Sequence, residues 1–389
     1  MTAGGRGGDP LPDRARPLVL DSHVDTPSRI LYEGFRLDSR ARTGHVDIAR
    51  LRAGGVDAVV FAIFIDKAFS AERGRSAIEA IRMLDAAAEE VARHPRDLAL
   101  CRTAAETRAA AASGRIAVLF GLEGGHAIED DLALLRAFAR LGVRYLTLTH
   151  VNSNGWCDSS ADAPRWGGLN ALGREAVAEM NRVGIVPDVS HVSDAAFEQV
   201  LEASARPVVA SHSSCRALCD SPRNLTDGML RALARKDGVV MINAYPAFLS
   251  SEYRAAANRR DAAHADAEKA ITKAFPGPEN AWRRWTEWIR FAAEHPPQAD
   301  LPSLAAVSEH VMHAVAVAGE DHVGLGTDFD GIPVAPRGFE DCSRIVALRD
   351  DLARRGLGTP ALRKFLGENF LRVLEASEPG VQESRAPGR

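Results

Sequence analysis

Short apolar runs alternate with longer helix-forming stretches along most of this 389-residue chain. Near-continuous apolar character is typical of strands that are buried on both faces, as in parallel sheets. Eight such runs occur, at 17–23, 56–65, 115–125, 144–150, 184–191, 206–212, 238–245 and 322–329. The alternation therefore predicts an α/β fold that is built on a parallel sheet.

The stretches between these runs have helical character. The longest covers 70–94, a second at 131–142 ends in a glycine, and a third at 193–204 begins with a serine suited to capping. Eight strands that alternate with helices predict a (β/α)₈ TIM-like barrel. A doubly wound open sheet is the alternative, but it usually carries a glycine-rich phosphate turn after its first strand. Here the first strand runs into DSHVDTP instead.

The seventh and eighth runs are separated by a long, largely helical segment. It holds a charged stretch at 253–270 and three tryptophans, Trp282, Trp285 and Trp288, whose three-residue spacing places them on one helix face. We expect this face to pack in the core, with a lid or a subunit contact as the alternative. We interpret the segment as a helical insertion in a single domain over 15–377. The tails 1–14 and 378–389 are expected to be disordered.

Charge and composition exclude several classes of protein. A net charge of −4 argues against a nucleic-acid binder, and no run of 18 apolar residues that could cross a membrane is present. The N-terminus lacks the apolar stretch of a signal peptide, and the polar C-terminus lacks a lipid-anchor tail. Five cysteines are few for this length and suggest a reducing compartment. We therefore expect a cytoplasmic protein that binds neither nucleic acid nor membrane.

Polar residues stand at the ends of most predicted strands, where a barrel places its catalytic groups. Four are histidines and three are carboxylates, and chance rarely places so many at matching positions. They are His23 and Asp25 after the first strand, then Glu123, His150, His191, His212 and Asp328. We therefore expect these seven side chains to converge at the C-terminal mouth of the barrel.

This set has the composition of a metal site. Imidazole nitrogens and carboxylate oxygens suit Zn²⁺ or a similar first-row ion, and seven groups are too many for one tetrahedral ion. They fit two ions that share a bridging ligand. Barrel sites of this kind often use a modified lysine as the bridge, but none of the five lysines stands at a strand end. Glu123 is the carboxylate that is available for this position.

The motifs of this chain resemble those of the membrane (renal) dipeptidase family, peptidase family M19, in the amidohydrolase superfamily. The resemblance runs from about residue 17 to about 373 and ends in the segment GENFLRV. The motifs are DSHVDTP, FGLEGGHAI, YLTLTHVNSN, DVSHVSD, SHSSCRALCDSPRNLTD and GLGTDFDG. Each is short, but their order and content together are specific.

The resemblance implies a site with two Zn²⁺ ions per chain. His23 and Asp25 would bind one ion, and Glu123 would bridge both. His191 and His212 would bind the other ion. The implied activity is a zinc-dependent dipeptidase that cleaves L-Xaa-L-Xaa or L-Xaa-D-Xaa dipeptides by attack of a metal-bridging hydroxide.

Further roles follow from matching positions in the family. Asp328 matches the aspartate that acts as acid and base, and His150 matches the histidine that contacts the scissile carbonyl. Arg223, in SPRNLTD, matches the arginine that binds the terminal carboxylate of the substrate. Tyr245, in MINAY, stands where the family has a tyrosine that contacts the substrate.

Two other functions are compatible with the sequence. One is a different hydrolase on the same two-metal site, acting on a lactone, a phosphoester or a cyclic amide. The other is a catalytically silent metal-binding protein, although every expected ligand and Asp328 are present. The expected partner is a small dipeptide substrate. The tryptophans and the family also make a homodimer plausible.

Overall fold

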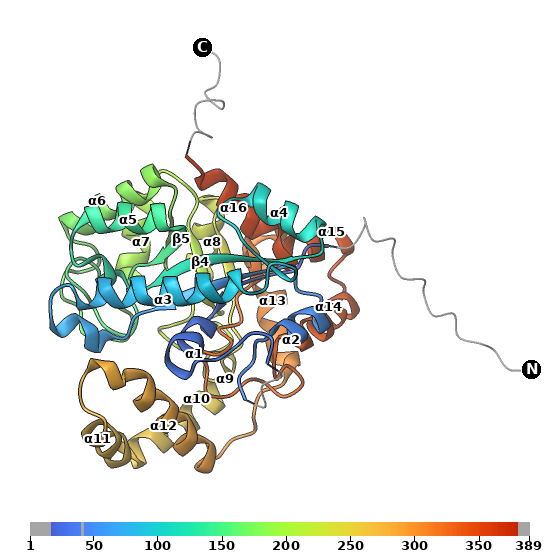
Figure 1. Cartoon of the computed structure of the whole chain (residues 1–389). Coiled ribbons are helices and arrows are strands. Elements are labelled where there is room, and N and C mark those ends of the chain that lie inside the picture. Colours follow the sequence, from blue (N-terminus) through green and yellow to red (C-terminus); the bar gives the residue numbers. More distant parts are fainter. Residues whose placement is uncertain (1–16, 40–42, 380–389) are drawn as a thin grey trace, which may run out of the picture.

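Parallel strands wrap into a barrel that is surrounded by helices (Figure 1). The computed structural model describes residues 17–39 and 43–379. Within these residues the barrel strands are β1 (Leu20–Val24), β2 (Ala58–Phe64), β4 (Ile116–Glu123), β5 (Val143–Thr147), β6 (Val186–Asp188), β7 (Val209–Ser213), β8 (Val239–Ile242) and β9 (Val323–Leu325). Neighbouring strands pair in this order. The predicted (β/α)₈ barrel is therefore confirmed.

The barrel closes between its first and last strands, directly beneath the predicted site. A parallel bridge joins Val24 to Phe329, and the backbone nitrogen of Asp25 donates to the carbonyl of Phe329 over 2.8 Å. The backbone nitrogen of Asp328 donates in turn to the carbonyl of His23 over 3.0 Å. Closure therefore brings together polar residues that are about 300 positions apart in the chain.

A short strand outside the barrel path was not predicted. Strand β3 (Leu98–Leu100) pairs with the first residues of β4, from Ile116 to Val118. The neighbouring β5 pairs with β4 only from Phe120 onward, so the start of β4 has a free edge. β3 covers that edge and satisfies its backbone groups.

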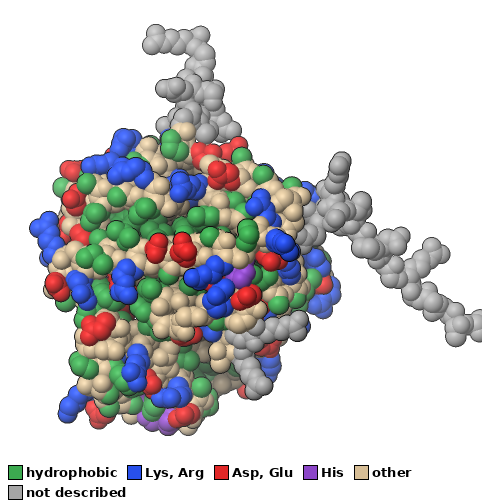
Figure 2. Space-filling view, in the orientation of Figure 1, with side chains coloured by type: hydrophobic (Ala, Val, Ile, Leu, Met, Phe, Trp, Pro, Cys, Tyr) green, Lys and Arg blue, Asp and Glu red, His purple; other side chains and the backbone are tan. Residues whose placement is uncertain are grey.

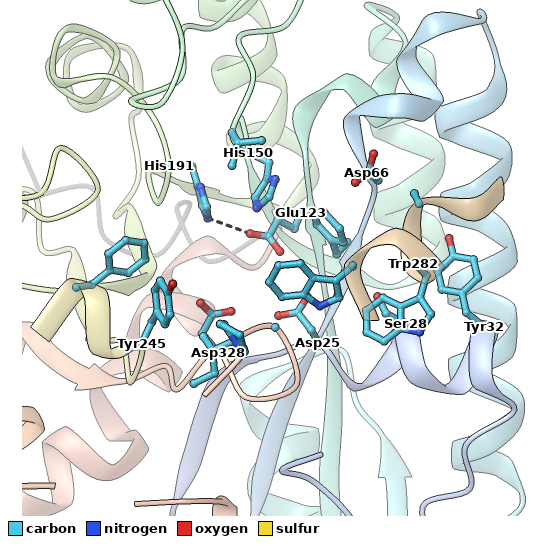
Figure 3. A pocket seen from close by; sticks show the side chains of 18 of the residues that line it. Asp25, Ser28, Tyr32, Asp66, Glu123, His150, His191, Tyr245, Trp282 and Asp328 are labelled. Carbon is cyan, nitrogen blue, oxygen red and sulfur yellow. Dashed lines mark ion pairs between the residues drawn. The ribbon is translucent and has the colours of Figure 1, made fainter. Parts of the chain in front are cut away.

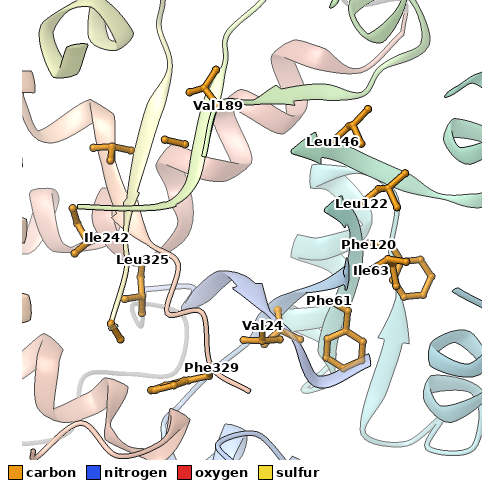
Figure 4. Close-up of a cluster of buried hydrophobic side chains, with 14 of the residues drawn as sticks. Val24, Phe61, Ile63, Phe120, Leu122, Leu146, Val189, Ile242, Leu325 and Phe329 are labelled. Carbon is orange, nitrogen blue, oxygen red and sulfur yellow. The ribbon is translucent and has the colours of Figure 1, made fainter. Parts of the chain in front are cut away.

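Alternate residues of the strands enter two separate apolar clusters. In β2, Val59, Phe61 and Ile63 belong to a cluster that also contains helix residues such as Met83 and Phe138. Figure 4 shows Phe61, Ile63, Phe120 and Leu122 of this cluster on neighbouring strands. The intervening Ala58 and Val60 belong to the second cluster, which includes residues of the C-terminal helix. Strand alternation therefore packs one face on the helices and fills the lumen with the other.

Helices follow the barrel strands, as the alternation predicts. They are α1 (Thr26–Glu33), α2 (Ile48–Ala53), α3 (Arg75–Ala92), α4 (Ala104–Ala112), α5 (Leu132–Leu141), α6 (Ala171–Val183), α7 (Asp194–Ala203), α8 (Asp227–Arg235), α13 (Leu304–Ala318), α14 (Ile345–Arg354), α15 (Thr359–Arg363) and α16 (Asn369–Ser377). The three predicted helices correspond to α3, α5 and α7. The Ser193 side chain caps α7 by accepting from the backbone of Ala196, and Gly142 ends α5 in a left-handed conformation.

The predicted helical insertion lies between the seventh and eighth barrel strands, β8 and β9. It consists of α9 (Pro246–Leu249), α10 (Ser251–Ala263), α11 (Ala265–Ala274) and α12 (Ala281–Glu294). In Figure 1, α10, α11 and α12 lie together on one side of the barrel, next to α1. The insertion therefore stands beside the chain that follows β1.

The visible face of the molecule carries basic and acidic side chains that are interspersed (Figure 2). Among the described residues, no helix is both long and apolar enough to cross a membrane. The predicted tails fall outside the described residues, except for Glu378 and Pro379. Glu378 accepts a hydrogen bond from the backbone of Ala104 over 2.8 Å.

Candidate active site

The histidines and carboxylates predicted at the strand ends converge at the mouth of the barrel. Ligand atoms of three sets lie within 4.8 Å of one another: His23, Asp25 and Glu123; Glu123, His150 and His191; and His23, His212 and Asp328. All seven predicted residues therefore belong to one connected cluster. His23, Asp25, Glu123 and His212 are buried, and the other three are partly exposed.

Glu123 lies at the centre of this cluster, with its two carboxylate oxygens turned toward different histidines. Oε2 lies 3.2 Å from Nε2 of His23, which is also 3.6 Å from Oδ2 of Asp25. Oε1 lies 3.3 Å from Nε2 of both His191 and His212. Figure 3 shows Glu123 between Asp25 and His191, with a dashed line to His191. One carboxylate thus contacts two separate ligand sets, which is the arrangement of a bridging ligand.

A tyrosine orients the His23 ring. The Tyr145 hydroxyl lies 2.7 Å from Nδ1 of His23 and donates its own hydrogen to the carbonyl of Ser22 over 3.1 Å. Since that hydroxyl has only one hydrogen, it must accept from Nδ1 of His23. Nε2 of His23 is therefore directed at Glu123. It is buried and has no hydrogen-bond partner among the described residues.

Ser211 and Asp188 orient the His212 ring in the same way. The Ser211 hydroxyl donates to Oδ2 of Asp188 over 2.6 Å and lies 2.8 Å from Nδ1 of His212. A carboxylate can only accept, so the single serine hydrogen points to Asp188 and Nδ1 of His212 is the donor to Ser211. This leaves the Nε2 lone pair of His212 facing Glu123. Metal-binding histidines are commonly fixed by a hydrogen bond of this kind.

The electrostatics of the cluster favour a bound cation. Burial lowers the pKa values of His191 and His212 well below the ordinary range, so both rings are neutral and can donate a lone pair. Burial also lowers the pKa of His23, but Glu123 and Asp25 raise it by more. Positive charge is therefore stabilised at Nε2 of His23, whether it comes from a proton or from a metal ion. The neutral rings and the three carboxylates fit divalent metal ions with mixed nitrogen and oxygen ligands.

Asp328 lies beside Asp25 on the segment that follows β9. Its Oδ2 accepts from the Asn243 amide over 3.0 Å, and its φ of 65° is in the left-handed region. A Cβ added to Gly331 would lie 2.2 Å from an oxygen of Asp25 and 2.6 Å from an oxygen of Asp328, so only glycine fits there. Burial raises the pKa of Asp328 above the ordinary range. The side chain is thus a buried carboxyl that can exchange a proton.

His150 lies on the opposite side of the cluster from Asp328. Its ring packs against the edge of Phe64 at 4.7 Å and lies 4.5 Å from the ring of His191. Burial lowers the pKa of His150 below its ordinary value. Because Glu123 and His191 lie within ligand distance of it, the ring borders the space above the bridging carboxylate.

Arg223 has a buried guanidinium group that contacts residues at the end of β7. Nη1 donates to the Ser213 hydroxyl over 2.7 Å, and Nη2 donates to the carbonyl of His212 over 2.6 Å. Among the described residues, no carboxylate lies within ion-pair distance of it, and its Nε has no hydrogen-bond partner. Burial lowers its pKa to about 10, so the group is still charged at neutral pH. An unpaired buried cation is costly and fits an anionic ligand group.

A cavity of about 490 Å³ opens above the cluster. Tyr245 and Phe248 line it at the end near Arg223, whose guanidinium carbon lies 5.6 Å from the centre of the Phe248 ring. Trp282 and Trp285 of the insertion line the cavity as well. The expectation that these tryptophans pack in the core is therefore wrong for both, because the insertion folds over the barrel mouth. Trp288 instead stacks on Phe291 within the insertion.

Three positioning residues were missed from the sequence, namely Tyr145, Asp188 and Asn243. The sequence does contain a signal for them, because each is a polar residue within or just after an apolar run. Asp188 ends β6, in the same way that Glu123 ends β4. Tyr145 lies within β5 and is fully buried, so its hydroxyl needs a partner.

The sequence matches a known protein family over nearly its whole length. A family model described as membrane dipeptidase (peptidase family M19) matches residues 14–387. Dipeptidase verJ from Clonostachys rogersoniana is 32% identical over 386 residues, which cover 95% of this chain and 87% of that protein.

Solved structures are similar over nearly the whole chain. The probable dipeptidase PvdM from Pseudomonas aeruginosa has a TM-score of 0.79 at 26% identity, covering 93% of this chain and 96% of that one. A metallopeptidase from Rhodobacter sphaeroides, solved with a phosphinate mimic of the dipeptide L-Ala-D-Ala, has a TM-score of 0.74 at 26% identity. That match covers 93% of this chain and 99% of the other.

Proposed function

Because the chain belongs to the membrane dipeptidase family, peptidase family M19, we propose that it is a dipeptidase that works with two bound zinc ions. The observation that carries this proposal is the position of Glu123 between two sets of buried ligands. His23 and Asp25 would hold one ion, and His191 and His212 would hold the other. Two such ions would lower the pKa of a water molecule held between them and polarise the carbonyl of the scissile bond.

The residues around this centre move protons and bind charge. Asp328 accepts a proton from the attacking water and then donates it to the nitrogen of the leaving group. The Asn243 amide holds the Asp328 carboxyl in place through the 3.0 Å hydrogen bond. His150 donates to the carbonyl oxygen as negative charge develops on it, a role for which such donors typically supply about 3 kcal/mol.

Arg223 fixes the far end of the substrate. Its guanidinium lacks an anionic partner among the described residues and can bind the C-terminal carboxylate of a dipeptide. Tyr245, which lines the same end of the cavity, would contact that C-terminal residue. With one substrate end at Arg223 and the other at the metal cluster, the cavity accepts two residues and excludes longer peptides.

The substrate class is therefore L-Xaa-L-Xaa or L-Xaa-D-Xaa dipeptides. The relative from Rhodobacter sphaeroides supports a D-residue at the C-terminal position, because it was solved with a mimic of L-Ala-D-Ala. The relative from Clonostachys rogersoniana, which is named a dipeptidase, supports the activity itself.

Recognition of both substrate ends gives the test of this function. The zinc-loaded protein should hydrolyse L-Ala-L-Ala or L-Ala-D-Ala. It should act at least about 100-fold less well on the C-terminal amide and on the N-acetyl form of the same dipeptide, since each modification leaves a buried charge unpaired. The measurement is kcat/KM for each compound, determined with one enzyme preparation.

Tri-alanine is the control for length and should also be a poor substrate. Equal rates on the free and blocked dipeptides would contradict recognition of the two ends. Hydrolysis of a lactone, phosphoester or cyclic amide without any hydrolysis of dipeptides would instead assign the same centre to a different hydrolase.

A further inference from the structure

The cavity extends beyond the proposed metal centre, away from Arg223. Figure 3 shows Tyr245 on one side of Glu123 and Asp25, and Tyr32, Ser28, Trp282 and Asp66 on the other. The catalytic groups described above need only the central part and the Arg223 end. The remaining end, which holds Tyr32, Asp66 and Trp282, is here called the distal subsite.

Aromatic faces form one wall of the distal subsite. The rings of Tyr32 and Trp282 are stacked, with their centroids 6.0 Å apart and an interplanar angle of 20°. Their polar atoms are engaged elsewhere, because the Tyr32 hydroxyl donates to Glu79 over 2.7 Å and the Trp282 indole nitrogen donates to Glu33 over 3.0 Å. Ring faces of this kind attract cations.

Two carboxylates that line the cavity, Asp66 and Glu268, add negative charge to it. Asp66 follows β2, and one of its oxygens accepts from the backbone nitrogen of Ala68 over 2.8 Å, which leaves the second oxygen for a ligand. Glu268 is an exposed residue of α11 at the rim. Among the described residues that line the cavity none is lysine or arginine, and Arg223, which lies 5.6 Å from the Phe248 ring, stands at the other end. Asp25, Glu123 and Asp328 would balance the charge of bound metal ions, so Asp66 and Glu268 supply additional negative charge.

The direction of the substrate decides which residue reaches the distal subsite. Under the proposed function, the C-terminal carboxylate binds Arg223 and the scissile bond lies over Glu123. The side chain of the N-terminal residue then lies on the side of Tyr32, Asp66 and Trp282. We propose that the distal subsite selects dipeptides whose N-terminal residue has a long cationic side chain, lysine or arginine.

The inference is tested by comparing L-Lys-L-Ala with L-norleucyl-L-Ala, which has a similar length but lacks the charge. The expected kcat/KM is about tenfold higher for the lysyl dipeptide, the size of one charge-assisted hydrogen bond. L-Ala-L-Lys, which has the charge at the other end, should show no such gain over L-Ala-L-norleucine. Equal kcat/KM values for the lysyl and norleucyl dipeptides would overturn the proposal.

A substitution tests whether Asp66 causes the preference for the lysyl dipeptide. Asp66→Asn keeps the capping oxygen and should remove most of the lysyl preference while leaving kcat/KM for L-Ala-L-Ala within about twofold. Asp266→Asn is the matched control, because it removes a charge from α11 at a position outside the cavity. An equal loss on both substrates would place Asp66 against the α-ammonium group and overturn the side-chain assignment.

A second pair of variants tests the aromatic wall. Trp282→Ala should lower the lysyl preference by about fivefold, whereas Trp288→Ala, on the same helix but outside the cavity, should not. Unchanged preference in Trp282→Ala would contradict the role of the aromatic wall.

A binding measurement distinguishes the selectivity of the distal subsite from the dipeptidase activity itself. In the Asp328→Asn variant, tryptophan fluorescence can follow binding of L-Lys-L-Ala and L-norleucyl-L-Ala without turnover. Tighter binding of the lysyl dipeptide would support the distal subsite even if the wild-type protein hydrolysed no dipeptide. Equal binding together with normal hydrolysis of L-Ala-L-Ala would reject the subsite and retain the proposed function.

Discussion

Asp328→Asn is expected to lower kcat for L-Ala-D-Ala by about 10²- to 10⁴-fold, the range that a general acid–base group contributes. Asparagine still accepts the hydrogen bond from Asn243 and tolerates the φ of 65°, but it cannot take up a proton from water. The loss should therefore appear in kcat, with the melting temperature and the metal content close to those of the wild-type protein.

Asp237→Asn is the matched control for this substitution. Asp237 also has a positive φ, of 55°, but it is exposed and lies on the loop after α8. Its variant should keep full activity. If Asp328→Asn turned over substrate at the wild-type rate, the acid–base role of Asp328 would be rejected. If the variant lost its metal, Asp328 would be assigned as a ligand instead.

Arg223→Met is expected to lower kcat/KM for L-Ala-L-Ala by about 10²- to 10³-fold, because a truncated charge pair in a buried site typically costs a few kcal/mol. Methionine fills a similar volume without the charge. The C-terminal amide of the same dipeptide has no carboxylate to pair, so its already low kcat/KM should change little. Steady-state kinetics on the acid and the amide, with both proteins, form a double-mutant cycle.

Arg216→Met is the control for Arg223→Met. Arg216 lies in the same loop but forms an ion pair with Asp194 at 2.6 Å, whereas Arg223 has no carboxylate partner among the described residues. Its variant should retain dipeptide hydrolysis. Equal losses on the acid and the amide in Arg223→Met would mean that the arginine maintains the fold of the loop and does not bind the carboxylate.

The sequence predicted the barrel and the cluster of histidines and carboxylates for the same physical reason. Strands that are buried on both faces must be apolar, so a charged residue at the end of such a run is conspicuous. Glu123 and His212 both stand at the C-terminal ends of their strands, and parallel strands bring those ends together. The convergence of these residues followed from topology alone.

Residues that act through a second residue were harder to predict. The hydrogen bonds from Ser211 to Asp188 and from His23 to Tyr145 depend on the strand registers within the barrel, which apolar periodicity does not specify. Strand β3 was missed because it is three residues long and covers only the free start of β4.

The tryptophans of the insertion were predicted to pack in the core for a different reason. Their spacing identifies a shared helix face but not the surface that this face covers. Trp282 and Trp285 turned out to line the cavity, because the insertion folds beside α1 and over the barrel mouth. Positions of this kind depend on tertiary packing, which the spacing of residues along one helix does not specify.

The most direct test of the central claim is a zinc titration of the metal-free protein, with hydrolysis of L-Ala-D-Ala as the readout. The site has two ligand sets joined by Glu123, so activity should rise to a plateau as two equivalents of zinc bind. Zinc bound should be measured in the same samples. A plateau at one equivalent, or no hydrolysis at any zinc content, would contradict a dipeptidase with two metal ions.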